Sequence, residues 1–152
     1  MEQQRSAEEL ISDRVNAAIN CNNLSVVELR SKNYPAALQA ARQALSHIEK
    51  TLLEQTQQFS ASILQANQAF LENLHVLLVS YYNLGMCQLQ IAQTRQDSAG
   101  HATLPRTDGD PLQEARKVFQ QALKLSSRFL GLNYYFTVKL KRKAERVEMI
   151  VQ

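Results

Sequence analysis

Residues 32–48 read KNYPAALQAARQALSHI, a run that joins a helix start to a helix face. Pro35 suits the first turn of a helix, because the N–H group that proline lacks would have no partner there. Apolar residues then recur at steps of three and four positions, the spacing of one helix face: Ala37, Leu38, Ala41, Ala44, Leu45, Ile48 and Leu52. We therefore expect a helix from residue 35 to about residue 57.

The residues before this stretch predict a helix that leads into it. Residues 6–9 read SAEE and fit a capping box, in which a Ser hydroxyl and a Glu carboxylate satisfy free backbone N–H groups. Apolar residues follow at helical spacing, from Leu10 and Ile11 to Cys21. This first helix should end near residues 31–33, so that a short turn joins it to the next.

Three more helices are expected downstream. Residues 58–62 form a weak linker with a Ser cap, and a long helix should follow over about 63–95, with a bend near residues 73–76. Residues 97–110 are rich in Gly, Pro, Ser, Thr and Asp, and we interpret them as a mobile loop insertion. Asp110 and Pro111 start a helix that Gly131 stops, and a last helix covers about 134–151.

Composition favours a single all-α domain over residues 1–152. The chain is 45% apolar, consists largely of good helix formers, and has four Gly and three Pro, two of each within residues 100–111. No apolar run reaches the length of a membrane span, and the polar N-terminus does not resemble a signal or transit peptide. Cys21 and Cys87 are not spaced as a CxxC pair, so we expect a reducing, cytoplasmic compartment.

Two segments of the chain share one spacing of bulky and small residues. In both, a bulky residue precedes a small one by three positions, and small or aromatic residues follow four and seven positions on. The two sets are Tyr34, Ala37, Ala41 and Ala44, and Leu112, Ala115, Phe119 and Ala122. With Tyr81, Leu84 and Gly85 before the second set, the pattern resembles the tetratricopeptide repeat, over residues 18–51 and again over 78–128.

The end of the second unit is similar to a longer form of this repeat. Ala122-Leu123, then Leu130-Gly131, then Thr137 resemble the ending of kinesin-light-chain-type repeats. The resemblance implies antiparallel helical hairpins stacked as a short α-solenoid. About five helices would make two repeat units, an N-terminal extension and a C-terminal capping helix. Small residues such as Gly85 would let the helices approach closely, and Tyr81 and Phe119 would fill the gaps between them.

The resemblance also implies a partner-binding groove, because the first helix of each unit lines one in this family. The register gives eight lining residues: Asn22, Val26, Leu29, Arg30, Tyr82, Asn83, Met86 and Gln90. Such a mixture suits an extended peptide or a helix of another protein. The simpler interpretation is that these side chains are only solvated.

The charge of the chain is concentrated at its C-terminal end. The net charge is +3, yet residues 111–152 alone carry nine Lys/Arg against three Asp/Glu. A basic stripe lies beside an apolar one on the last expected helix, and its residues are Lys139, Arg142, Lys143 and Arg146, with Lys141 elsewhere on the helix. This patch is either a solvated face of a capping helix or a contact for an acidic surface.

No catalytic or metal-binding motif is evident, so we expect no enzyme activity, no cofactor and no metal. His47 and His75 are far apart and lack the spacing of metal ligands, and His101 falls in the expected loop. The two cysteines suit buried, structural thiols. An enzyme would need a catalytic group that the sequence does not display.

The leading hypothesis is a non-enzymatic interaction or scaffold module. Because two or three repeat units bury their faces only against neighbours, the ends near Leu10, Ile11, Ile150 and Val151 should stay partly exposed. The chain would then be a small subunit of a larger assembly, and the repeat resemblance suggests a cytoskeletal or ciliary one. The alternative is an adaptor whose basic helix binds an acidic polymer, either a tubulin tail, RNA or anionic lipid, with RNA the weakest of the three.

Overall fold

The computed structural model describes residues 6–97 and 109–151, and within these ranges the chain is all-helical, as the sequence predicts. Its helices are α1 (Ala7–Arg30), α2 (Tyr34–Gln58), α3 (Ala61–Gln65), α4 (Gln68–Asp97), α5 (Pro111–Phe129) and α6 (Tyr135–Val151). The bounds of α1, α2, α5 and α6 agree with the expected ones to within about two residues. Most of the expected loop, residues 98–108, lies outside the described residues.

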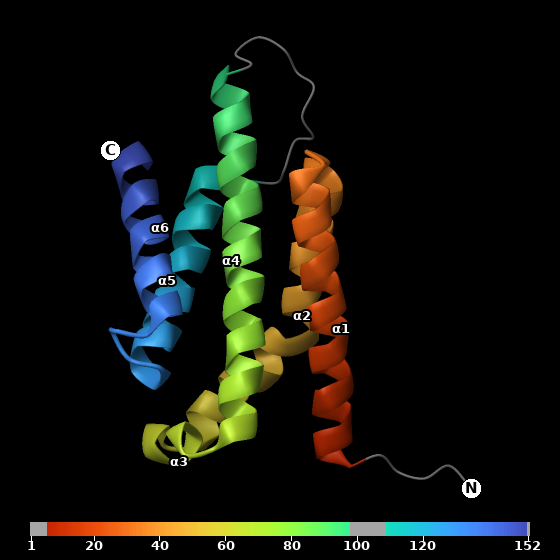
Figure 1. The fold of residues 1–152 in the computed structure, drawn as a ribbon, viewed down its shortest axis with the longest axis vertical. Helices are drawn as coiled ribbons and strands as arrows, with labels where there is room; N and C mark the ends of the chain where they lie inside the picture. Colours follow the sequence, from red (N-terminus) through yellow and green to blue (C-terminus); the bar gives the residue numbers. More distant parts are fainter. Residues whose placement is uncertain (1–5, 98–108, 152) are drawn as a thin grey trace, which may run out of the picture.

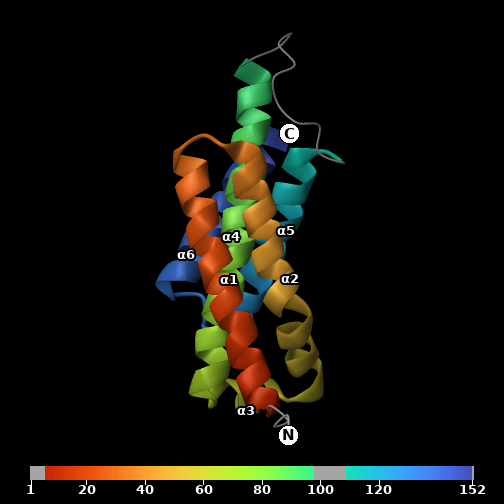
Figure 2. The same cartoon turned by 90° about the vertical axis from the view of Figure 1, so that its right-hand side faces the viewer.

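The helices are arranged around α4. Figure 1 shows α4 in the middle of the molecule, with α1 and α2 on one side and α5 and α6 on the other. In the view turned by 90°, α1 and α6 lie toward one side of the molecule and α2 and α5 toward the opposite side (Figure 2). Antiparallel packing joins α1 to α2, α4 to α5 and α5 to α6, and α4 also contacts α1 and α2.

Short polar side chains fix the helix starts. The Ser6 hydroxyl accepts a hydrogen bond from the backbone N–H of Glu9 at 3.2 Å, which confirms the predicted Ser cap of α1. Asp110 caps α5 in the same way by accepting from Leu112 N–H at 3.0 Å. After α5, Gly131 adopts a φ of 94°, a conformation that a residue with a side chain rarely takes.

The expected start of the long helix at residue 63 is wrong. Ser60 caps a separate one-turn helix, α3, whose Leu64 is buried, and the chain then turns at Ala66 and Asn67. The Asn67 side chain accepts a hydrogen bond from the N–H of Phe70 at 3.1 Å, and so starts α4 at Gln68. The break therefore falls before α4, which is continuous through residues 73–76, and residues 6–97 and 109–151 form six helices instead of the expected five.

Small residues allow the helices to approach closely, as the sequence predicts. Ala37, Ala44, Ala115 and Ala122 are fully buried. A side-chain carbon added at Gly85 would lie 2.5 Å from Cζ of Phe119, which is closer than real side-chain atoms approach. The α4–α5 distance therefore depends on the absence of a side chain at Gly85.

Buried polar groups also connect neighbouring helices. The Ser25 hydroxyl of α1 donates a hydrogen bond to the backbone carbonyl of Ala37 in α2 at 2.9 Å. The Tyr81 hydroxyl of α4 donates to Oε2 of Glu49 in α2 at 2.5 Å. Because each buried polar group needs a partner, these bonds fix the register of adjacent helices.

The two ends of the described chain keep apolar side chains partly in solvent, as expected. Leu10 is 48% exposed, and the other three predicted residues are half-buried: Ile11, Ile150 and Val151. Among the described residues, no helix has the length and apolar content that crossing a membrane requires.

Candidate functional site

The residues predicted to line a groove lie on α1 and α4, and six of the eight reach the surface. Arg30 is exposed, and the other five are half-buried: Val26, Leu29, Tyr82, Met86 and Gln90. We call these six residues the α1–α4 face. Apolar, amide, aromatic and guanidinium groups are all represented, so the face can make both apolar and hydrogen-bonded contacts.

Asn22 and Asn83 differ from the other six because they are buried, at 5% and 6% exposure. Asn22 Nδ2 donates a hydrogen bond to Oγ of Ser80 at 2.9 Å, and Asn83 Nδ2 donates to Asn22 Oδ1 at 3.4 Å. The two asparagines therefore join α1 to α4 beneath the surface instead of lining it. The spacing along each helix groups the asparagines with the other six residues, but the close approach of α1 and α4 at this level removes the amides from solvent.

Tyr82 connects α4 to the last two helices. Its ring lies edge-on to Phe119 of α5, with 6.1 Å between the centroids, and 5.8 Å from the ring of Phe136 in α6. The ammonium nitrogen of Lys139 in α6 lies 4.6 Å from the centre of the Tyr82 ring, which is a cation–π contact. A residue of the predicted groove and a residue of the predicted basic stripe are thus in direct contact.

Two further cations of α6 lie beside Lys139. Lys143 is half-buried and Arg146 is exposed. Burial, together with the positive charges of Arg146 and Lys139, lowers the pKa of Lys143 below the usual lysine value. We call Tyr82, Lys139, Lys143 and Arg146 the aromatic–basic cluster. Because three positive charges lie close together in this cluster, it attracts negatively charged groups.

The other members of the predicted basic patch, Lys141 and Arg142, are exposed. At about 100° per residue of α-helix, Lys141 lies roughly 160° around α6 from Lys139, whereas Arg142 lies only about 60° from it. Lys139, Lys143 and Arg146 lie on the side of α6 that adjoins Tyr82, Arg142 borders them, and Lys141 lies on the other side of the helix.

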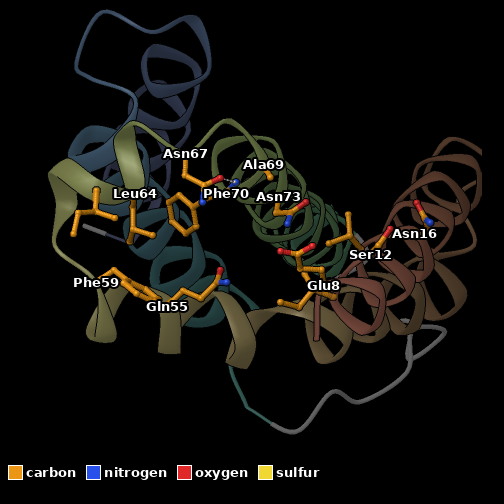
Figure 3. A pocket seen from close by; sticks show the side chains of 13 residues that line it. Glu8, Ser12, Asn16, Gln55, Phe59, Leu64, Asn67, Ala69, Phe70 and Asn73 are labelled. Atoms are coloured by element: carbon orange, nitrogen blue, oxygen red, sulfur yellow. Dashed lines mark hydrogen bonds between the residues drawn. The ribbon is translucent and has the colours of Figure 1, made fainter. Parts of the chain in front are cut away.

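Sequence reasoning missed a cavity at the end of the molecule where α1 and α4 begin. It measures about 640 Å³ and lies among the start of α1, the end of α2, α3 and the start of α4. Figure 3 shows side chains from all four segments around it, including Glu8, Gln55, Leu64 and Phe70. The cavity exists because α3 turns the chain before α4, and the sequence analysis had merged α3 into the long helix.

Within the described residues, no three His, Cys, Asp or Glu side chains gather as metal ligands do. Cys87 is buried, as predicted, and burial raises the pKa of its thiol. Cys21 is only partly buried. The ring of His75 packs against Phe136 with 5.4 Å between centroids, and His101 lies outside the described residues. Cys87, Cys21 and His75 thus pack against other side chains of the described structure.

No family model matches the chain, and no curated protein and no solved structure matches it either.

Proposed function

We propose that this chain is a non-enzymatic interaction module that holds another protein on the α1–α4 face. The observation that carries the proposal is the contact between Tyr82 and Lys139. It places the half-buried apolar and amide side chains of α4 beside the cations of α6 on one surface. A surface that combines aromatic, apolar and charged groups is typical of protein-binding sites.

The helix order supports a short stack of tetratricopeptide-like hairpins. The pair α1–α2 packs against α4, the pair α4–α5 follows, and α6 packs on α5. The close contact between Gly85 and Phe119 occurs where the repeat resemblance places a small residue against an aromatic one. In such a stack, α6 would act as the capping helix and the first helix of each pair would face the partner.

Exposed apolar side chains support the role of a subunit in a larger assembly. On the outer side of α1, Leu24 is 50% and Val27 is 57% exposed, and Met149 near the end of α6 is 76% exposed. Short helical stacks bury such side chains against a neighbouring element. A cytoplasmic, cytoskeletal or ciliary setting follows from the repeat resemblance and belongs to the same proposal.

A second candidate function is an adaptor for an acidic polymer, which would be a tubulin tail, RNA or anionic lipid. The observation that favours it is the position of Lys143 between two other cations, Lys139 and Arg146. This candidate uses the same surface of α6 as the first one, but it requires no contact with α1.

Site-specific photo-crosslinking in cells of the native source tests the main proposal. A photoreactive amino acid replaces Met86 on the α1–α4 face, and Gln43, which is exposed on α2, in a matched control. We expect a discrete adduct with another protein from position 86 and none from position 43. Equal labelling from both positions, or none from position 86, would contradict the proposal.

A further inference from the structure

We propose that the partner segment is an acidic stretch of protein whose carboxylates bind the aromatic–basic cluster of Tyr82, Lys139, Lys143 and Arg146. This inference rests on the proposed function, because it names the partner for part of the same surface. The proposed contact lies where Tyr82 of α4 meets Lys139 of α6, and it does not extend along the whole basic helix.

The three cations of the cluster are available to an outside partner. They recur at steps of four and three residues, which spaces their positions by about 6 Å and 4.5 Å along the axis of α6. No ion pair joins any of them to an acidic side chain within the described residues. By contrast, Arg116 on α5 meets Glu148 of α6 at 2.6 Å. Glu148 is thus directed toward α5 and away from the cluster.

Tyr82 holds one of these cations in place before a partner arrives. Its ring is fixed between Phe119 and Phe136, and the Lys139 ammonium lies over it. A long, flexible lysine side chain loses less conformational entropy on binding when it is already positioned. A carboxylate that approaches Lys143 also relieves the repulsion that Lys139 and Arg146 exert on it.

The same geometry favours a peptide over nucleic acid. Single-stranded RNA is bound through bases that stack on aromatic rings. The ring of Tyr82 packs against two other rings and is covered by Lys139, so it offers no free platform for a base.

The neighbouring surface favours a peptide over a membrane. Met86 and Gln90 follow Tyr82 on α4 at steps of four residues and are half-buried, as is Val26 of α1, and this mixture of apolar and amide groups suits a peptide main chain and its side chains.

Fluorescence anisotropy on the purified chain tests the inference with a fluorescein-labelled Glu-Ser repeat peptide. We expect binding that weakens with salt, and no binding of the matching Gln-Ser peptide. The triple variant K139Q/K143Q/R146Q should lose about tenfold in affinity or more. The control K50Q/K117Q/K124Q removes the same charge from exposed lysines of α2 and α5, and it should change the affinity less than about twofold.

A second variant separates the cluster from net charge. Tyr82→Leu keeps every cation but removes the ring beneath Lys139, so we expect about a threefold loss of affinity with the salt dependence unchanged. Thermal melting of each variant shows whether it is folded at the assay temperature. If Y82L does not fold, Lys139→Gln tests the same contact by comparison with Lys141→Gln, which removes the same charge from the other side of α6.

Three results would overturn the inference. They are an equal loss in both triple variants, equal binding of the Gln-Ser peptide, and tighter binding of poly-uridine RNA or phosphatidylserine vesicles than of the acidic peptide. The proposed function is tested separately. A crosslink from position 86 without cluster-dependent peptide binding would reject the acidic partner and leave the proposed function standing. Cluster-dependent binding of the acidic peptide without that crosslink would reject the α1–α4 face as the wider binding site and leave the cluster as the binding site.

Discussion

Gly85 of α4 lies directly against the ring of Phe119 in α5. A side-chain carbon at position 85 would lie 2.5 Å from Cζ, 2.7 Å from Cε1 and 2.8 Å from Cε2 of that ring. Phe119 is fully buried and its ring meets Tyr82, so it has little space in which to move. This contact sets the distance between two helices and also supports the ring on which Lys139 lies.

Replacing Gly85 with alanine should therefore destabilise the protein. Alanine in a helix is ordinarily more stable than glycine by about 0.5–1 kcal/mol, but overpacking of a filled core costs about 1–3 kcal/mol. We expect the second effect to be larger, with a net loss in the free energy of unfolding measured in urea. In a Phe119→Leu background the same substitution should be less harmful, and an equal loss in both backgrounds would refute the steric explanation.

The buried pair Asn22 and Asn83 should be coupled energetically. Asn22→Ala leaves the buried amide of Asn83 without its side-chain acceptor, so we expect a loss of about 1–3 kcal/mol in the free energy of unfolding. The double alanine variant should lose less than the sum of the two single variants, because each one already breaks the shared bond. Asn23→Ala, at an exposed position of α1, serves as the control and should change stability by less than about 0.5 kcal/mol.

Glu114 should stabilise the folded protein more through its hydrogen bond with Gln88 than through its ion pair with Arg42. It accepts a hydrogen bond from the buried Gln88 amide at 2.7 Å, and it also pairs with Arg42, whose side chain is 45% exposed. Glu114→Ala leaves a buried donor unpaired, which costs about 1–3 kcal/mol, whereas Arg42→Ala removes only an exposed ion pair, for about 0–1 kcal/mol. Equal losses in chemical denaturation would show that the ion pair carries the stabilisation.

Tyr81 should make the protein less stable at high pH. Burial and the hydrogen bond to Glu49 raise the pKa of its hydroxyl above the usual value of 10.0. Above pH 10 the unfolded chain loses this proton while the folded chain keeps it, so the stability present at lower pH declines as pH rises. In Tyr81→Phe the slope of unfolding free energy against pH should be shallower by at most about 1.4 kcal/mol per pH unit. Identical slopes for the two proteins between pH 10 and 12 would contradict this assignment.

The sequence was most informative about features that depend on residues close to one another along the chain. Ser6 and Asp110 were identified as caps because a helix start is a local hydrogen-bonding event. A Ser cap was expected within residues 58–62, but the same rule was not applied to Asn67, because the apolar residues around it continue the helical spacing and hid the break between α3 and α4. Local patterns compete in that segment, and tertiary burial of Leu64 decides between them.

The candidate site was less predictable because it depends on contacts between distant segments. The spacing on α4 placed Tyr82 among the groove residues, and the charge pattern placed Lys139 on a basic stripe. Neither pattern predicts the packing of α6 on α5 beside α4, which brings the Lys139 ammonium to 4.6 Å from the centre of the Tyr82 ring. For the same reason, the burial of Asn22 against Asn83 follows from the approach of two helices and not from either helix alone.

The central position of α4 has a consequence for how the molecule folds. This one helix supplies buried residues to both sides, from Phe70 to Ile91, and packs against α1, α2, α3 and α5. If either side detached, the matching half of α4 would expose its apolar surface to water, at about 25 cal/mol for each Å². Opening of one side is therefore penalised by the other, and the described helices should unfold in a single cooperative transition instead of one pair at a time.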